Sequence, residues 1–382
     1  MLRWCFLCGL FEQNGGSRVL LSQIELSDFR NYERAACSPA PGINVVTGEN
    51  AAGKTNFLEA VYFALCGGSF RSSRENEVVR FGAEKAIIRA CVSMDGFTVN
   101  TAAEVRSDGK TLVLNGKDGQ KRDFPGRRRT LLFRPEDLEV LTGPPAGRRR
   151  FIDQIFFGLV PAYEEAHRQF YRALQQRNAL LRLGRGMVPE TGEFKTWTDA
   201  CVTYGTRLCR LRLNGLALFA PAAASIYRQL TGTKIFLRYV RSIGGGESEA
   251  EVRELFYVKL HGLLAQELRY GHTMAGPHRD DFIFMLKDND LRRHGSRGEQ
   301  RTAVLAMKLA EAGLLEKSTD DRIVYLLDDV FSELDRRRRQ ALLENIVGRQ
   351  AFITATETPI AADGAVYRVE NGKICRTGTE PT

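Results

Sequence analysis

A glycine-rich segment is the feature that most constrains how this chain can fold. Residues 48–55 read GENAAGKT and fit the phosphate-binding loop pattern G-x-x-x-x-G-K-[ST] at every position. Residues 43–47 before it are mostly apolar, as in a short buried strand, and residues 56–66 after it carry an apolar face at helical spacing. The sequence therefore predicts a strand, a phosphate-binding loop and a helix. A chance glycine-rich turn is the weaker interpretation.

The chemistry of this loop predicts a bound nucleoside triphosphate with a magnesium ion. Backbone N–H groups of the loop and the start of the following helix would point at phosphate oxygens. Lys54 would reach the β- and γ-phosphates, and the Thr55 hydroxyl would hold Mg²⁺. The expected nucleotide contacts comprise the whole loop, which consists of Gly48, Glu49, Asn50, Ala51, Ala52, Gly53, Lys54 and Thr55.

Composition is typical of a soluble globular protein and gives only weak information on partners. The 382 residues suffice for two or three domains, or for one large domain with an insertion. The net charge of +9 suggests an anionic partner, of which nucleic acid is the commonest. The eight cysteines do not complete a zinc site, and we interpret most of them as reduced core residues. No apolar run is long enough to span a bilayer, so no membrane association is expected.

Apolar periodicity divides the chain into a discontinuous head and an inserted lobe. Residues 19–150 and 270–382 show strand alternation and mixed α/β patterning, whereas residues 151–269 show helical spacing. Alternation in the first segment predicts an antiparallel layer. Residues 1–18 are interpreted as a non-native or disordered extension added by a misassigned start codon, with translation beginning at Val19. Peptides from this extension in mass spectrometry of the natural protein would refute that hypothesis.

An acidic segment supplies two groups that ATP hydrolysis needs besides the phosphate loop, a second magnesium ligand and a group that positions the attacking water. Residues 323–327 form a continuous apolar run that ends in Asp328 and Asp329, as at the carboxyl end of a buried parallel strand. Asp328 is the expected magnesium partner, and Asp329 is placed to orient or deprotonate water. With Lys54 they are the predicted catalytic residues. The alternative is a strand that ends in a solvated acidic turn.

A third segment precedes the acidic run. Residues 295–301 read GSRGEQR and come before an amphipathic helix expected over residues 302–315. Ser296 offers a hydroxyl, while Gly298 and the helix start offer N–H groups and the positive end of the helix dipole. Any capped helix could look like this, and only the position before the acidic strand favours a role with the nucleotide.

The order of these motifs resembles that of the ATP-binding-cassette heads of the SMC and Rad50 type, including Ser-x-Leu-Asp at 332–335. Further stretches are similar to the RecF family of bacterial DNA replication and repair proteins. These are FRNY at 29–32, RPEDL at 134–138, GPHRDD at 276–281, SRGEQR at 296–301, LDDVFSELD at 327–335 and FITAT at 352–356. The resemblance covers about residues 19–358. It implies an α/β fold, an ATP-binding-cassette (P-loop NTPase) head with an antiparallel β layer and an inserted helical lobe.

The resemblance also implies that two protomers sandwich two ATP molecules. Ser296 and Gly298 would contact the γ-phosphate held by the other protomer, and residues 332–335 would cross the dimer interface. ATP would complete this interface and hydrolysis would release it. Three further residues join the expected nucleotide contacts, namely Arg30, Asn56 and Glu299.

Two departures from general cassette ATPases match the RecF pattern and imply slow turnover. Asp329 stands where most such proteins have glutamate, and Thr354 or Thr356 stands where many have histidine. The glutamine that often senses the γ-phosphate has no evident counterpart, and Glu136 lies in about the right region.

The function implied by the resemblance is ATP-dependent DNA binding in replication and recombinational repair. The protein would dimerise on double-stranded or gapped DNA at gaps or stalled forks, help RecO and RecR load RecA, and act in the cytoplasm at the nucleoid. Arginines near 127–129, 148–150, 182–185 and 336–339 could contact phosphates, although for any one cluster a solvated or internally paired role is the better interpretation. His278 is either structural or an interface residue.

Two other functions stay open. A cassette ATPase with a different task, such as an ATP-driven nuclease, would need a further acidic metal-binding domain, for which no segment remains. An ATP-gated scaffold with negligible hydrolysis is compatible with the short side chain of Asp329.

Overall fold

The chain forms two compact units. Unit 1 comprises residues 1–132, 319–332 and 346–382, and unit 2 comprises residues 133–318 and 333–345. The computed structural model describes residues 17–72, 74–94, 96–127, 129–184, 192–319, 321–332, 334–357 and 364–377.

The boundaries of the units differ from the expected division into head and lobe. The expected head also included residues 133–150, 270–318 and 333–345, which belong to unit 2. Most of the expected N-terminal extension, residues 1–16, lies outside the described residues, and the first strand begins at Ser17. The start-codon hypothesis therefore stays a prediction.

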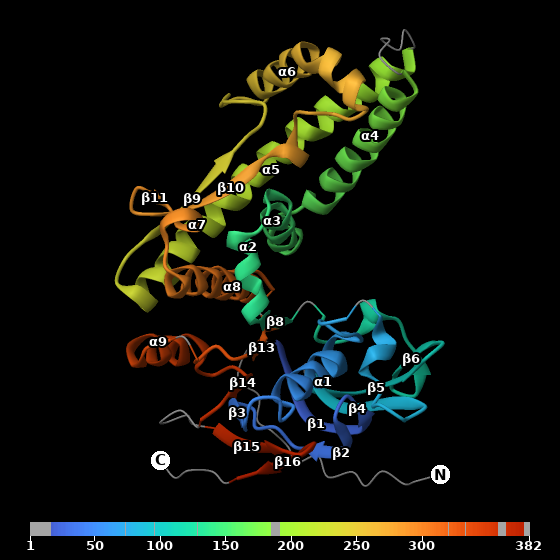
Figure 1. Ribbon diagram of the computed structural model, residues 1–382, viewed down its shortest axis with the longest axis vertical. Coiled ribbons are helices and arrows are strands. Elements are labelled where there is room, and N and C mark those ends of the chain that lie inside the picture. Colours follow the sequence, from blue (N-terminus) through green and yellow to red (C-terminus); the bar gives the residue numbers. More distant parts are fainter. Residues whose placement is uncertain are drawn as a thin grey trace. The chain divides into compact units, whose positions relative to one another are not determined.

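The core of unit 1 is a sheet whose central strands are parallel (Figure 1). Strand β3 (Ile43–Thr47) pairs in parallel with β14 (Ala351–Ala355) and β15 (Gly364–Glu370), and β14 pairs in parallel with β13 (Val324–Leu327). Every residue of β3, β13 and β14 is buried, as their largely apolar sequences predict. The carboxyl ends of these three strands therefore meet at one edge of the sheet. The outer strands are β16 (Lys373–Arg376) and β8 (Thr130–Phe133).

Helix α1 (Lys54–Cys66) packs between this sheet and an antiparallel layer, since it contacts β14 on one side and β1, β4 and β5 on the other. The antiparallel pairs β1–β4, β4–β5 and β5–β6 confirm the layer predicted from alternation. The strands of the layer are β1 (Ser17–Phe29), β2 (Tyr32–Cys37), β4 (Lys85–Met94), β5 (Phe97–Arg106), β6 (Gly109–Leu114), β7 (Lys117–Asp118) and β12 (Asp321–Arg322). Two short 3-10 helices accompany it, η1 (Glu75–Val78) and η2 (Lys121–Asp123).

Unit 2 is mostly helical, and its helices α4 and α5 pack along one another (Figure 1). The longer helices are α3 (Pro145–Leu159), α4 (Tyr163–Gly184), α5 (Gly192–Thr231), α6 (Glu249–Tyr270), α8 (Arg297–Thr319) and α9 (Arg336–Ile346). The shorter ones are η3 (Pro135–Leu138), α2 (Glu139–Thr142), η4 (Pro277–Arg279) and α7 (Leu291–His294). Among the described residues, no helix combines the length and the apolar character needed to cross a membrane.

Two details of unit 2 differ from the sequence predictions. The helical spacing over residues 151–269 gave no sign of a break near residue 160, but the chain breaks after α3, where Ala162 has a φ of 61° that an α-helix does not contain. A three-stranded antiparallel sheet also lies in this unit, formed by β9 (Ile235–Val240), β10 (Asp281–Leu286) and β11 (Asn289–Asp290). Strand β9 pairs with β10, which lies more than 40 residues further along the chain. Its short apolar run therefore did not indicate a strand within the expected helical lobe.

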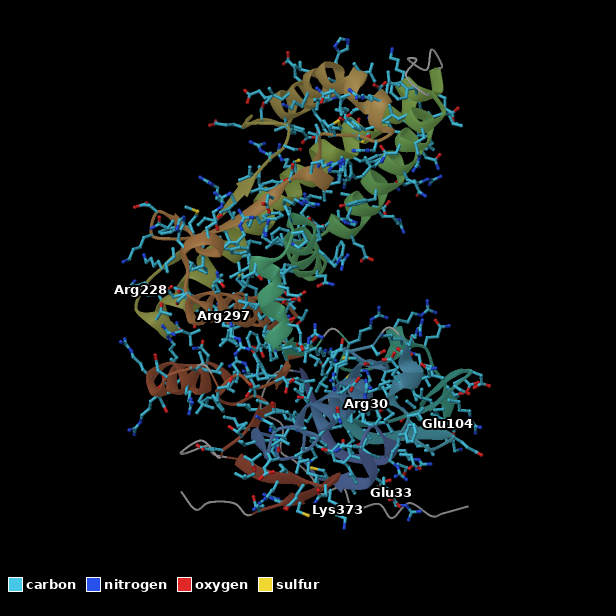
Figure 2. The ribbon with its side chains drawn as sticks, viewed as in Figure 1. Arg30, Glu33, Glu104, Arg228, Arg297 and Lys373 are labelled. Carbon is cyan, nitrogen blue, oxygen red and sulfur yellow. The ribbon has the colours of Figure 1, made fainter. Side chains whose placement is uncertain are left out.

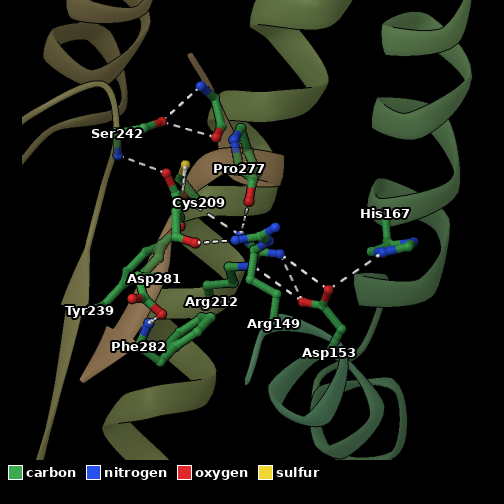
Figure 3. Close-up of polar contacts among 12 residues, drawn as sticks. Arg149, Asp153, His167, Cys209, Arg212, Tyr239, Ser242, Pro277, Asp281 and Phe282 are labelled. Atoms are coloured by element: carbon green, nitrogen blue, oxygen red, sulfur yellow. Dashed lines mark hydrogen bonds and ion pairs between the residues drawn. The ribbon is translucent and has the colours of Figure 1, made fainter. Parts of the chain in front are cut away.

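A buried ion-pair network joins α3, α5 and this sheet (Figure 3). The Arg212 guanidinium on α5 is fully buried and donates to both carboxylate oxygens of Asp153 on α3, at 2.9 and 3.2 Å, and to the carbonyl of Pro277 at 2.7 Å. The Asp280 carboxylate lies 3.6 Å from the guanidinium and accepts a hydrogen bond of 2.7 Å from the N–H of Ser242. Each buried charge thus has an opposite charge and further hydrogen bonds, which is what makes its burial tolerable.

His278 lies beside this network. Its Nε2 is 3.0 Å from the carbonyl oxygen of Thr273, and its ring lies 5.9 Å from that of Phe170. Burial lowers the pKa of His278 to about 4, so the imidazole is neutral near pH 7. These contacts favour the structural interpretation of this histidine over the interface role.

We expect Arg212→Met to lower the free energy of unfolding by about 3–5 kcal/mol, because it leaves Asp153 and Asp280 buried without their cation. The matched control is Arg210→Ala on the same helix, whose exposed pair with Glu249 at 3.4 Å should contribute less than about 1 kcal/mol. Urea denaturation followed by circular dichroism measures both changes. Equal losses for the two variants would contradict a stabilising role of the network.

Candidate nucleotide-binding site

The phosphate loop joins β3 to α1 at the carboxyl edge of the core sheet of unit 1. Gly48 and Gly53 have φ values of 153° and 115°. A Cβ on Gly53 would lie 2.4 Å from the amide nitrogen of the Asn31 side chain, and a Cβ on Gly48 would lie 2.4 Å from the carbonyl oxygen of Val369. Both positions therefore require glycine, for their backbone conformation and for the close approach of neighbouring chain segments.

Lys54 begins α1 and holds its ammonium group over the loop. Its Nζ donates to the carbonyl oxygens of Gly48 at 2.7 Å and Glu49 at 2.9 Å. Burial lowers the pKa of Lys54, and the nearby carboxylates of Asp329 and Asp328 oppose that shift. The fold thus keeps a cation at the loop, where phosphate oxygens need one.

The two predicted magnesium ligands are brought together. Thr55 Oγ1 lies 3.0 Å from each carboxylate oxygen of Asp328, which directly follows β13. Asp328 also accepts a hydrogen bond of 2.7 Å from the hydroxyl of Thr354 on β14. The Thr354 oxygen in turn accepts a hydrogen bond of 2.7 Å from the N–H of Asp329. A hydroxyl and a carboxylate are oxygen ligands of the kind that Mg²⁺ prefers, so this pair fits the ion.

These contacts separate the roles of the two threonines that could replace the histidine of other cassette ATPases. The Thr354 hydroxyl is engaged with Asp328 and with the backbone of Asp329. Thr356 instead lines a cavity of about 970 Å³ beside the loop, together with Asn50. Thr356 is therefore the better candidate to face the nucleotide.

The turn between β1 and β2 braces the phosphate loop, a role that no sequence pattern indicated. Asn31 Nδ2 donates to the carbonyl of Ala52 at 2.9 Å, and the buried hydroxyl of Tyr32 donates to the carbonyl of Gly53 at 2.9 Å. Asn56 Nδ2 donates to Asn31 Oδ1 at 2.8 Å. The motif at residues 29–32 pointed to the family, and only the folded chain shows that it contacts the loop.

Two of the expected nucleotide contacts near the loop are engaged with protein groups. The Arg30 guanidinium donates to both carboxylate oxygens of the buried Glu59, at 2.9 and 2.8 Å, and to the carbonyl of Glu77 at 2.7 Å. Asn56 is hydrogen-bonded to Asn31. The roles of Arg30 and Asn56 as direct nucleotide contacts stay predictions.

The signature segment lies in unit 2, at the start of α8, which begins at Arg297 rather than at the expected residue 302. Glu299 Oε2 accepts from the N–H of Ser296 at 2.8 Å and from its hydroxyl at 2.9 Å, while Ser296 Oγ lies 3.3 Å from the N–H of Glu299. This is a capping box, so Glu299 serves the local helix start. Among the described residues, a Cβ on Gly298 would meet only the Arg338 guanidinium, at 3.7 Å, so the first turn of α8 is open toward them at this point.

The arginine clusters differ in their availability for DNA. Arg148 is buried and donates to both carboxylate oxygens of Asp281, at 2.7 and 2.9 Å, and Arg129 donates to Asp321 at 2.7 Å. These two arginines are therefore internally paired, the alternative favoured for single clusters. Arg336 and Arg337 at the start of α9 are exposed. Glu136 is exposed on η3 of unit 2, and its assignment as a γ-phosphate sensor stays a prediction.

Three features define this part of the chain as an ATP-binding-cassette ATPase head. They are a phosphate loop after a buried strand, a hydroxyl and a carboxylate suited to Mg²⁺ at the end of a parallel strand, and an antiparallel layer over α1. The family model described as RecF/RecN/SMC N terminal domain matches residues 20–370. The DNA replication and repair protein RecF of Desulforudis audaxviator (strain MP104C) is 39% identical over 360 residues, which are 93% of this chain and 98% of that protein. RecF of Pelotomaculum thermopropionicum is 36% identical over 366 residues, 93% of this chain and all of that protein. The chain belongs to the RecF family.

Solved structures agree with this assignment. A structure described as the recombination mediator protein RecF-ATP in the RecFOR pathway is 29% identical, covers 97% of this chain and 100% of its own, and has a TM-score of 0.80. The Smc head domain of Pyrococcus furiosus, bound to the C-terminal domain of ScpA, is 16% identical, covers 94% of this chain and 96% of its own, and has a TM-score of 0.58. The second likeness supports the fold alone.

We expect Asn31→Ala to weaken ATP binding roughly 30-fold, because it removes two hydrogen bonds that hold the loop, each contributing about 1 kcal/mol. Glu33→Ala is the matched control, since Glu33 lies two residues further and is exposed, and its ion pair with Arg80 is long, at 3.8 Å (Figure 2 labels Glu33). Titration calorimetry with ATP and Mg²⁺ measures both dissociation constants. Unchanged affinity in Asn31→Ala would show that the loop holds its shape without the brace.

Proposed function

We propose that this chain is an ATP- and magnesium-dependent DNA-binding ATPase of replication and recombinational repair. The observation that carries the proposal is the pairing of Thr55 with Asp328 at 3.0 Å beside Lys54, in a chain similar over nearly its whole length to RecF proteins. ATP would lie with its phosphates on the loop, and Mg²⁺ would take the place between Thr55 and Asp328. The ion would neutralise phosphate charge, while Lys54 would supply a second positive charge at the β- and γ-phosphates.

Each nucleotide would be completed by a second protomer. The signature offers the Ser296 hydroxyl and the open first turn of α8, where the positive end of the helix dipole favours phosphate oxygens. The Asp335 side chain accepts from the N–H of Arg338 at 2.8 Å, which fixes the segment that follows the acidic strand at the start of α9. We infer that ATP joins the loop of one protomer to the signature of the other, so that dimerisation depends on ATP.

Asp329 would orient or deprotonate the attacking water. Its φ of 47° is unusual for a residue with a side chain, and its N–H is held by Thr354 at 2.7 Å. A strained backbone that neighbouring groups hold in place is a feature of functional positions. The carboxylate is one methylene shorter than glutamate, which supports slow hydrolysis. ATP would then hold the dimer on DNA for a long time before hydrolysis releases it.

The DNA and protein partners are proposed from the likeness to the RecF family. Double-stranded and gapped DNA, at gaps or stalled forks of the nucleoid, would be bound through phosphates rather than base edges, because the chain carries a net charge of +9. Similarity to a recombination mediator of the RecFOR pathway supports work with RecO and RecR in loading RecA.

Fluorescence anisotropy of a labelled gapped duplex, with and without ATP and Mg²⁺, tests the proposal. We expect ATP to strengthen binding in the wild type and to have no effect in Lys54→Ala, which lacks the cation over the loop. Asp329→Asn should bind with ATP but dissociate more slowly than the wild type, because the bridging nucleotide is not hydrolysed.

Each result separates this function from its alternatives. DNA binding that does not depend on ATP would favour the alternative of a cassette ATPase with a different task. ATP-dependent binding with the same dissociation rate in Asp329→Asn and the wild type would favour an ATP-gated scaffold with negligible hydrolysis.

A further inference from the structure

Strand β9 of unit 2 is an edge strand. Its six residues, from Ile235 to Val240, are all in register with β10, and no other strand of the described chain pairs with it. One side of β9 therefore presents backbone N–H and C=O groups that a further strand can take up. Its sequence, IFLRYV, carries neither proline nor an inward-pointing charge of the kind that blocks such pairing.

A groove of about 490 Å³ runs between this edge and helix α5. The α5 side is lined by small side chains such as Ala220 and Ala224, which leave room beside the strand, and the other side is lined by the first residues of β9. Phe236 contributes to the groove and is 56% exposed, a large apolar side chain that the described part of the chain does not cover. The groove is thus lined mainly by apolar side chains and follows the first three residues of β9.

The exposed face of the sheet extends this apolar surface. Phe236 and Val240 are exposed on alternate positions of β9, with Arg238 between them. The register places Met285 opposite Phe236 and Ile283 opposite Arg238, and both of these β10 residues are only half-buried. An added strand would therefore find apolar neighbours on the sheet face as well as in the groove.

The groove is lined by cations, whereas the acids of the sheet face, Asp281 opposite Val240 and Asp290 opposite Met285, are paired with arginines. Arg228 on α5 and Lys234 before β9 are the ionisable residues that line the groove, and Arg238 is exposed on β9 (Figure 2 labels Arg228). Within the described part of the chain, none of these three side chains takes part in an ion pair or hydrogen bond. Cations that lack an internal partner and surround an apolar groove are complementary to a ligand with acidic and apolar groups.

This charge pattern decides between possible occupants. A second copy paired edge to edge through β9 would set Arg238 close to the same residue of its copy, and like charges oppose each other across paired strands. Nucleic acid phosphates would gain the cations but would leave Phe236 and the alanines without apolar partners. An acidic peptide with apolar side chains satisfies both features.

We propose that the groove between α5 and β9 binds an extended segment of a partner protein, in which apolar residues alternate with acidic ones, as an additional strand beside β9. Main-chain hydrogen bonds to the free edge would supply affinity, the groove would take the apolar side chains, and Arg228 and Lys234 would pair with the carboxylates. The groove belongs to unit 2, whereas the phosphate loop belongs to unit 1.

Selection from a random dodecapeptide library displayed on phage, against the full-length protein, tests the proposal. We expect enrichment of peptides in which aspartate or glutamate alternates with apolar residues. A fluorescein-labelled copy of the most enriched peptide should bind the Arg228→Glu/Lys234→Glu variant at least tenfold more weakly than the wild type, and Phe236→Ser should also weaken it. N-methylation of alternate amides in the peptide should abolish binding in one register and spare it in the other, since only one set faces β9.

The matched control is Lys195→Glu/Lys259→Glu, which reverses two exposed charges of unit 2 away from the groove and should leave peptide affinity within twofold of the wild type. Unchanged ATP affinity and melting temperature show that each variant is folded. Enrichment of basic peptides, no enrichment, or binding insensitive to the groove variants would overturn the proposal. So would nucleotide-independent dimers that Phe236→Ser abolishes in sedimentation equilibrium, because a second copy would then be the occupant.

Discussion

The hydrogen bond between Thr55 and Asp328 holds together the parts of the chain on which the nucleotide site depends. Thr55 lies in the first turn of α1, after β3 and the phosphate loop, and Asp328 directly follows β13. Strand β14 between these strands supplies Thr354, whose hydroxyl donates to the same carboxylate. The three strands are parallel, so their carboxyl ends meet and bring a hydroxyl and a carboxylate to within 3.0 Å. Glycines in the loop and the brace from Asn31 then keep the loop in the shape that a phosphate needs.

Local patterns predicted the phosphate loop, its strand and helix, and the acidic strand end, but not the brace that Asn31 and Tyr32 provide. Each of these predicted features depends on residues that are close together in the sequence, and so does the alternation in β1, β4, β5 and β6. The features that were missed depend on distant ones. Strand β9 pairs with β10, although α6 separates the two strands in the sequence. Arg212 comes close to Asp153 and Asp280 only when the helices pack. Nothing in the sequence around Arg212 distinguishes it from the exposed Arg210.

The signature shows how local structure and function can use the same residues. Ser296 and Glu299 form a capping box, which by itself explains a serine three residues before a glutamate. That capping leaves the first turn of α8 open at Gly298, which is what a phosphate from another subunit would require. Unit 2 thus combines a helix start that we propose faces a nucleotide with an edge strand and a groove lined by apolar and basic side chains.

Mixing two inactive variants tests most directly whether each nucleotide is shared between two chains. Lys54→Ala disables the loop, and Ser296→Arg blocks the signature. In a mixed dimer, one of the two sites combines the intact loop of the Ser296→Arg chain with the intact signature of the Lys54→Ala chain. Sedimentation velocity with ATP and Mg²⁺ should show no dimer for either variant alone and a dimer for the mixture. If the mixture stays monomeric while wild-type protein dimerises, the loop and the signature do not meet across two chains.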